Sequence, residues 1–127
     1  MNFILDTHTL IWFLEINPQL SSLAKKTIEN DSHKIFIRIA SIWEIAIKVQ
    51  TGKLSLTKTL EEIILETEKL QIEILTIDTS HVLSLQKLPL HHRDPFDRII
   101  IAQAITENFQ IVSKDEQFDL YRAKRVW

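Results

Sequence analysis

Short apolar runs alternate with longer amphipathic stretches along the chain. The short runs are rich in isoleucine and bounded by polar residues, a pattern that predicts β-strands. Strands are expected at residues 2–5, 34–39, 72–77 and 110–113, with a weaker one at 123–127. The longer stretches follow helical spacing and predict helices at 8–15, 21–30, 41–51, 59–70, 79–87 and 95–108. Gly52 can end the third of these helices in a left-handed conformation.

The regular alternation of strand and helix predicts an α/β fold. Helical connections place successive strands in parallel and cover both faces of the sheet. We therefore expect a three-layer α/β/α sandwich with a central, mostly parallel sheet of four to five strands. The chain has 127 residues, of which 45% are hydrophobic and 25% charged. This size and composition predict one globular domain over residues 1–127.

Composition excludes several kinds of chemistry. With one glycine and no cysteine, the chain has no glycine-rich phosphate loop, disulfide or thiolate zinc site. Its first residues lack a basic leader, and Asp6 interrupts the apolar run, so we expect no signal peptide and a cytoplasmic location. The net charge of −2 argues against nucleic-acid binding through overall charge. Such a role would need a local basic rim or a bound cation.

Four acidic residues fall where predicted strands end or the following helices begin. In a parallel sheet these positions share one edge, where ligands bind. Asp6 follows the first strand, Glu44 and Asp97 lie in the first turns of helices 41–51 and 95–108, and Asp115 lies two residues beyond strand 110–113. The topology therefore predicts that the four carboxylates lie close together.

Helix capping offers an alternative explanation for each acid taken singly. Asp94 before Pro95 is a good N-cap for the last helix, and it leaves open whether Asp94 also belongs to a site. Asp78 is expected to act only as an N-cap. The remaining capping candidates are Asp6 and two capping boxes, Ser41 with Glu44 and Ser113 with Glu116.

Taken together, the four acids predict a metal site. Carboxylates gathered at one edge repel one another strongly, and a helix dipole supplies only about half a charge. Either some acids stay protonated or a cation lies among them. Oxygen ligands suit Mg²⁺ or Mn²⁺ better than zinc. Such an ion polarises a phosphoryl oxygen and activates water, which is the chemistry of phosphodiester hydrolysis.

Four sequence blocks carry a family resemblance that extends over nearly the whole chain. They are DTHTLIW at 6–12, SIWEIAIKVQTGKL at 41–54, LPLHHRDPFDRIIIAQA at 88–104 and SKDEQF at 113–118. In this order, the blocks resemble a PIN-domain ribonuclease, specifically a VapC-type toxin of a prokaryotic toxin–antitoxin pair. The resemblance implies that Asp6, Glu44, Asp97 and Asp115 are the catalytic metal ligands. It also implies that Thr7 and Ser113 support them through hydrogen bonds.

The resemblance further implies an activity and partners. Family members hydrolyse RNA with Mg²⁺ or Mn²⁺, form homodimers and are inhibited by a cognate antitoxin in an apolar groove. Helices 8–15, 21–30 and 59–70 could form this groove or be ordinary core. Arg98, Lys48 and Lys53 are candidate phosphate contacts or solvated surface residues. Core packing is expected for Trp12 and Trp43, and a surface loop for His91 and His92.

Two other functions fit part of the pattern. A phosphatase of the haloacid dehalogenase type needs an acid two residues after its nucleophilic aspartate, but Asp6 is followed by Thr7 and His8. A catalytically inactive binding or regulatory module of the same fold would be marked by lost acids. All four positions are filled here, which favours the ribonuclease.

Overall fold

A computed structural model describes all 127 residues, and its centre is a five-stranded sheet. The strands are β1 (Asn2–Leu5), β2 (Lys34–Arg38), β3 (Glu73–Leu75), β4 (Gln110–Val112) and β5 (Arg125–Val126). They lie in the order β3-β2-β1-β4-β5, and every neighbouring pair is parallel. The predicted parallel sheet is therefore confirmed, including the weaker last strand.

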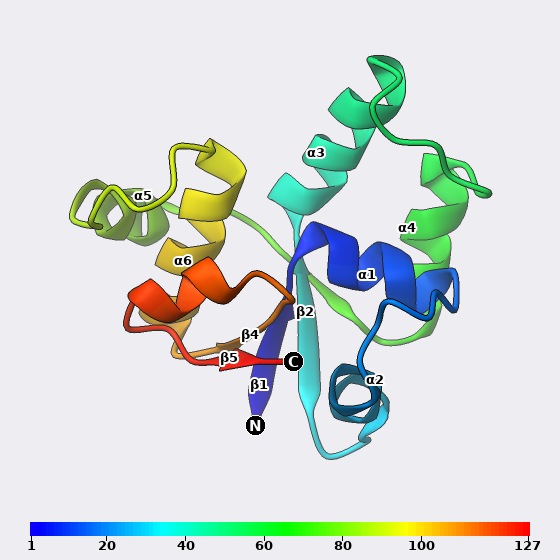
Figure 1. The fold of residues 1–127 in the computed structure, drawn as a ribbon, viewed down its shortest axis with the longest axis horizontal. Coiled ribbons are helices and arrows are strands. Elements are labelled where there is room, and N and C mark those ends of the chain that lie inside the picture. The colour runs from blue at the N-terminus through cyan, green and yellow to red at the C-terminus, as the bar shows by residue number, and fades with distance from the viewer.

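Six α-helices and one 3₁₀ helix connect the strands. They are α1 (Thr7–Leu14), α2 (Ser22–Glu29), α3 (Ile39–Gln50), α4 (Leu60–Lys69), α5 (Thr79–Gln86), α6 (Pro95–Glu107) and the 3₁₀ helix η1 (Glu116–Leu120). Figure 1 shows α1, α2 and α4 on one side of the sheet and α5 and α6 on the other. These layers confirm the predicted three-layer architecture. None of the helices is both long and apolar enough to cross a membrane.

Both faces of the sheet are buried, which explains why the strands are almost continuously apolar. Alternate residues of a strand point to opposite faces. Phe3 and Leu5 pack with residues of α1, α2 and α4. Ile4, between them, packs with Ile100 and Ile101 of α6 on the other face. Because successive side chains of β1 point to opposite faces, this one strand packs against both helical layers.

Several predicted helix ends are confirmed. The Asp78 side chain accepts hydrogen bonds from the backbone N–H groups at the start of α5. Asp94 caps α6 by accepting from the N–H of Phe96 at 2.8 Å. Beyond α3, Gly52 adopts a φ of +75°, the left-handed conformation that the sequence predicted for it.

Both capping boxes predicted at strand exits are wrong. Helix α3 begins at Ile39, two residues earlier than expected, so Ser41 lies inside it and Glu44 lies in its second turn. At the other exit, Asp115 rather than Ser113 is the N-cap residue of η1, and it accepts from the N–H of Gln117. The Ser41 hydroxyl instead hydrogen-bonds to the side chains of Thr7 and Arg38. The Ser113 hydroxyl donates to Asp6 and accepts from the Asp115 N–H.

Candidate active site

The ends of β1, β2 and β4 place three polar residues side by side. Leu5 is paired with Ile37 on one side and Val112 on the other. The next residues along these strands are Arg38, Asp6 and Ser113. The chain adds β2 and β3 on one side of β1 and later returns to place β4 on the other. A change of direction of this kind opens a crevice at the carboxyl ends of the strands, where α/β proteins bind ligands.

Asp6 is fixed in place through both carboxylate oxygens. Its Oδ1 caps α1 by accepting from the Thr9 N–H at 2.9 Å and the Thr9 hydroxyl at 2.6 Å. Its Oδ2 accepts a hydrogen bond from the hydroxyl of Ser113, at the end of β4. The cap expected from the sequence is confirmed, and the serine contact ties Asp6 to the neighbouring strand.

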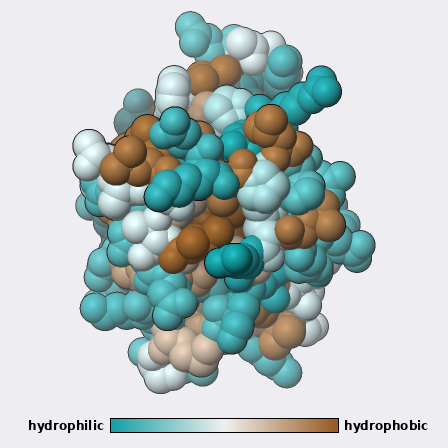
Figure 2. Space-filling view, turned by 90° about the vertical axis from the view of Figure 1, so that its left-hand side faces the viewer, coloured by the Kyte–Doolittle hydropathy of each residue, from teal (hydrophilic) through white to brown (hydrophobic).

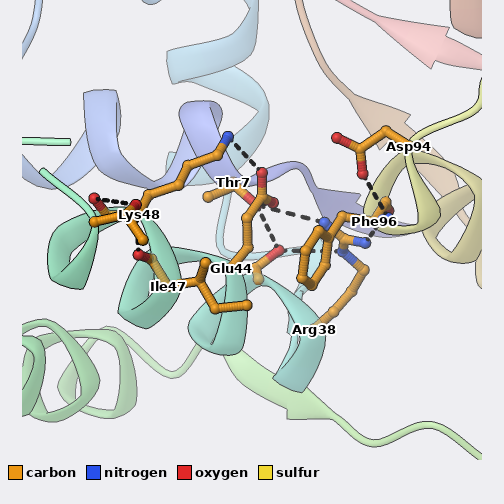
Figure 3. Close-up of polar contacts among 9 residues, drawn as sticks. Thr7, Arg38, Glu44, Ile47, Lys48, Asp94 and Phe96 are labelled. Atoms are coloured by element: carbon orange, nitrogen blue, oxygen red, sulfur yellow. Dashed lines mark hydrogen bonds and ion pairs between the residues drawn. The ribbon is translucent and has the colours of Figure 1, made fainter. Parts of the chain in front are cut away.

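Glu44 is the most buried of the four predicted acids, with 8% of its surface exposed. The Thr7 hydroxyl donates to its Oε1 at 2.6 Å, and the Lys48 ammonium donates to its Oε2 at 2.7 Å (Figure 3). The hydrogen bond to Glu44 raises the pKa of Lys48. The expected contacts of Thr7 and Ser113 are therefore both present, because Thr7 supports Glu44 and Ser113 supports Asp6.

Asp97 differs from the other three acids, because its half-buried carboxylate has no hydrogen-bond partner in the protein. Burial raises its pKa to about 6. The charge of Asp94 adds to this rise and His92 opposes it, while Glu44 and Asp115 contribute further in the upward direction. Asp94 is thus both an N-cap and a charged neighbour. The four predicted acids share one electrostatic environment with Arg38, and Asp97 is the one without a direct hydrogen-bond or ion-pair partner.

Asp115 is oriented by a histidine that we expected on the surface. His92 is buried, and its Nε2 lies 3.2 Å from Oδ2 of Asp115. The Tyr121 hydroxyl lies 3.0 Å from His92 Nδ1, and the Phe118 and Tyr121 rings stack on the imidazole. The expectation of a surface loop pair was therefore wrong for His92, because a pocket formed by the chain around η1 receives it. His91 is exposed.

Arg38 is a part of the site that the sequence did not reveal. Only 2% of its surface is exposed, and its guanidinium donates to Ser41 Oγ at 3.1 Å, to the Phe96 carbonyl at 2.6 Å and to Thr7 Oγ1 at 3.4 Å (Figure 3). Burial lowers its pKa to about 10, and four nearby acids oppose that shift, in the order Glu44, Asp6, Asp97 and Asp94. Arg38 therefore stays charged at neutral pH. A single arginine at the end of an apolar strand gave no signal of this role.

A shallow depression of about 290 Å³ opens at the exits of β1 and β4. Asp6 and Asp115 line it together with three residues not predicted for the site, His8, Trp12 and Lys114. Trp12 is half-buried, with the Lys114 ammonium 5.9 Å from its ring centroid. The second tryptophan expected in the core is also outside it, because Trp43 is 61% exposed. The depression thus combines acids with an aromatic side chain and a cation.

The carboxylates are gathered loosely. Three ligand atoms that all lie within 4.8 Å of one another occur in one group, which is Asp78, His81 and Glu107 rather than the predicted acids. In that group, His81 Nδ1 accepts from the Asp78 N–H at 3.1 Å while Nε2 lies 2.9 Å from Glu107. The two ring nitrogens point apart, so one ion cannot bridge both acids through them. We interpret this group as a cap that also ties α5 to α6.

The three candidate phosphate contacts differ in their surroundings. The Arg98 guanidinium donates to the carbonyls of Pro89, His92 and Leu85, so it holds the segment before α6. Lys48 is paired with Glu44, and Lys53 is exposed. Lys114, above the Trp12 ring, lies beside the depression. The cation at the β1–β4 crevice is therefore Lys114, which was not among the three candidates predicted from the sequence.

The fold and the site together define an α/β domain with acidic side chains at the crevice of a parallel sheet. The family model described as "PIN domain" matches residues 3–124. The chain therefore belongs to the PIN domain family. A comparison with curated proteins found no match.

Solved structures with the same fold include toxin–antitoxin complexes. VapBC2 from Rickettsia felis, bound to a DNA fragment from its promoter, has a TM-score of 0.74 and 16% identity, covering 99% of this chain and 98% of that one. VapBC-1 from nontypeable Haemophilus influenzae has a TM-score of 0.70 and 17% identity, covering 99% and 97%. A toxin–antitoxin complex from Klebsiella pneumoniae has a TM-score of 0.65 and 14% identity, covering 98% and 95%.

Proposed function

We propose that this protein is a Mg²⁺- or Mn²⁺-dependent endoribonuclease and the toxin of a VapC-type toxin–antitoxin pair, acting in the prokaryotic cytoplasm. The observation that carries the proposal is the state of Asp97. It is half-buried and without a hydrogen-bond partner, and its pKa is raised to about 6 by burial and by surrounding acids. A carboxylate in this position gains most from a cation placed next to it.

The donor set fits a hard divalent cation, because all four predicted side chains offer oxygen. Asp6 and Asp115 at the β1–β4 crevice and Asp97 at the start of α6 would hold the ion, and Glu44 would complete the acidic environment. When bound, the ion would supply polarisation of a phosphodiester and activation of water. The protein supports this chemistry by fixing the acids: Ser113 orients Asp6, His92 orients Asp115 and Thr7 orients Glu44.

The rim of the depression suits a nucleic-acid strand. Aromatic side chains stack on unpaired bases, and lysines attract backbone phosphates. Trp12 and Lys114 provide one of each beside Asp6 and Asp115. A local cation and a bound metal ion would together supply positive charge that the whole chain, at a net −2, lacks. These side chains favour a polymeric substrate over a small phosphate ester.

An inactive binding module of the same fold is the second candidate. The wide spacing of the carboxylate oxygens favours it, because no three of the predicted acids offer atoms within 4.8 Å of one another. Binding of a divalent ion by the nuclease must therefore draw these side chains together. The inactive module predicts RNA binding without cleavage, whereas the nuclease predicts cleavage under the same conditions.

Metal-dependent cleavage is the test. We expect the purified chain to cut RNA with Mn²⁺ or Mg²⁺, to stop when EDTA is added and to resume when Mn²⁺ is restored in excess. Cleavage would be followed on denaturing gels with single-stranded RNA, and a small phosphate ester would serve as the control substrate. Induced expression in bacteria should arrest growth, and a co-expressed cognate antitoxin should relieve the arrest. RNA cleavage that continues unchanged in EDTA would contradict the proposed function.

A pocket between α1 and α2 supports the proposed antitoxin partner. It has a volume of about 390 Å³ and is lined by Phe13, Ile16, Asn17, Pro18, Leu20, Lys25 and Glu29. Ile16 is 84% exposed and has a positive φ of 53°, an unfavourable conformation for a β-branched residue. An apolar segment of a partner would cover this side chain. Two of the three expected helices, α1 and α2, line the pocket together with the segment between them, while α4 contributes no lining residue.

Helix α3 carries an exposed apolar stripe that supports the proposed homodimer. Ile39, Trp43 and Ile47 follow one another at four-residue spacing and are 41%, 61% and 37% exposed. The face above α5 and α6 is different, because Figure 2 shows separate apolar patches there among hydrophilic residues. We expect light scattering to give the mass of two chains and Trp43→Glu to give the mass of one. A parent that is monomeric at high concentration would contradict this arrangement.

A further inference from the structure

Arg38 is a buried cation whose charge is not used in a direct ion pair. Its guanidinium donates only to neutral oxygens, those of Ser41, Phe96 and Thr7. The charge of Arg38 is nevertheless felt by the acids around it, which interact with it in the order Glu44, Asp6, Asp97 and Asp94. Because Arg38 is 98% buried, it cannot turn away into solvent when a metal ion approaches. Its positive charge is a permanent part of the site.

Lys48 adds a second positive charge on the same side. Its ammonium lies 2.7 Å from Oε2 of Glu44, while the Thr7 hydroxyl occupies Oε1 (Figure 3). Both oxygens of Glu44 therefore already have donors, and one of these donors is a cation. A metal ion bound directly by Glu44 would have to displace Lys48 and remain near the Arg38 guanidinium. The negative charge of Glu44 is therefore already balanced by nearby cations.

Simple charge counting indicates what remains to be neutralised. The four predicted acids carry four negative charges when ionised and Asp94 carries a fifth, while Arg38 and Lys48 return two. Three negative charges remain, and one divalent ion reduces them to one. Asp97, the acid without a hydrogen bond, lies among those that remain uncompensated. A second divalent ion would make the sum positive, close to a guanidinium that cannot leave.

We propose that Arg38, assisted by Lys48, occupies the electrostatic place of a second divalent ion, so that this site holds a single Mg²⁺ or Mn²⁺. The inference rests on the proposed function, since it concerns the metal of that same site. Arg38 is a positioning residue in this scheme. It holds Thr7, which orients Glu44, and the Phe96 carbonyl, which directly precedes Asp97.

The test counts bound Mn²⁺ on the full chain in the absence of RNA, by calorimetry and by the paramagnetic resonance signal of free Mn²⁺. We expect one ion for the parent and one for Arg38→Lys, which keeps the charge. Arg38→Met should bind a second ion at least about 100-fold more tightly than any weak second binding by the parent. Lys58→Met is the matched control and should bind one ion, because it removes a cation paired with Glu66 on α4, outside the site.

Each outcome decides a different point. Two tightly bound ions on the parent, or one ion with unchanged affinity on Arg38→Met, would overturn this inference and leave the proposed nuclease intact. No bound ion on the parent would overturn both. If circular dichroism shows that Arg38→Met does not fold, Lys48→Met provides the same comparison from a partly exposed side chain. It should bind the second ion about 10-fold more tightly than the parent, and unchanged binding there would also overturn the inference.

Discussion

Replacing Asp97 by asparagine is expected to stabilise the metal-free protein while removing its activity. The raised pKa of about 6 means that ionised Asp97 is unfavourable in the folded chain. Because the side chain is only half-buried, solvent screening reduces the effect to roughly 1 kcal/mol, or a few degrees in Tm. Without this proposed metal ligand, RNA cleavage should fall by at least about 100-fold. Thermal unfolding in EDTA and an RNA cleavage assay measure the two effects.

The stabilisation by Asp97→Asn should depend on pH in a defined direction. The pKa is raised in the folded state, so the folded chain holds this proton more tightly than the unfolded chain. The penalty is absent below the ordinary value of 3.8, grows as pH rises toward about 6 and is complete above it. The variant should therefore gain stability at pH 7.5 and none at pH 3.5. An equal gain at both values would show that charge is not the cause.

Added Mn²⁺ should reverse the order of stability. The ion stabilises whichever chain binds it, by an amount that grows with its concentration relative to the Kd. The parent should therefore overtake Asp97→Asn as Mn²⁺ is added at pH 7.5. Asp31→Asn is a suitable control, because Asp31 is exposed in the turn before β2. It should follow the parent in every condition.

Asp6→Asn and Ser113→Ala should give a graded loss of activity. Asparagine caps a helix about as well as aspartate, so Asp6→Asn should stay folded. It removes the charge at the crevice and should reduce cleavage by at least about 1,000-fold. Ser113→Ala leaves that charge in place but removes the hydroxyl that orients Asp6. Loss of such a supporting contact costs about 10- to 100-fold in metal affinity or activity.

The measurement for this pair is the initial rate of RNA cleavage over a range of Mn²⁺ concentrations. High Mn²⁺ should restore much of the rate of Ser113→Ala and none of the rate of Asp6→Asn. A rate for Asp6→Asn equal to that of the parent would show that Asp6 is not a metal ligand. Circular dichroism of both variants is the control for folding.

The fold could be predicted because burial determines which positions of the sequence are apolar. The isoleucine-rich strands are apolar on both faces, and Asp94, Asp78 and Gly52 define helix ends through local chemistry. The site could be predicted only in part. The parallel topology places Asp6 and Asp115 at one crevice, but contacts between distant segments have no local pattern. Arg38 and His92 owe their roles to burial against segments far away in the chain, so neither could be recognised from its neighbours.

Helix α3 shows how such distant contacts override local signals. Ser41 and Glu44 have the spacing of a capping box, yet the helix begins at Ile39 without a side-chain cap. Arg38 donates to the Ser41 hydroxyl, and Thr7 donates to Glu44. These side chains satisfy one another at the end of the sheet instead of bonding to the helix N-terminus. The two residues that match a capping box therefore serve the site and not the start of the helix.

The two outer strands of the sheet are very short, since β3 has three residues and β5 has two. The edge strand of a sheet exposes unpaired backbone N–H and C=O groups, to which an extended chain can add as a further strand. Short edge strands expose few of these groups. Fibrous growth by strand addition is therefore disfavoured. Contacts with other macromolecules are left to the helical surfaces and to the crevice between β1 and β4.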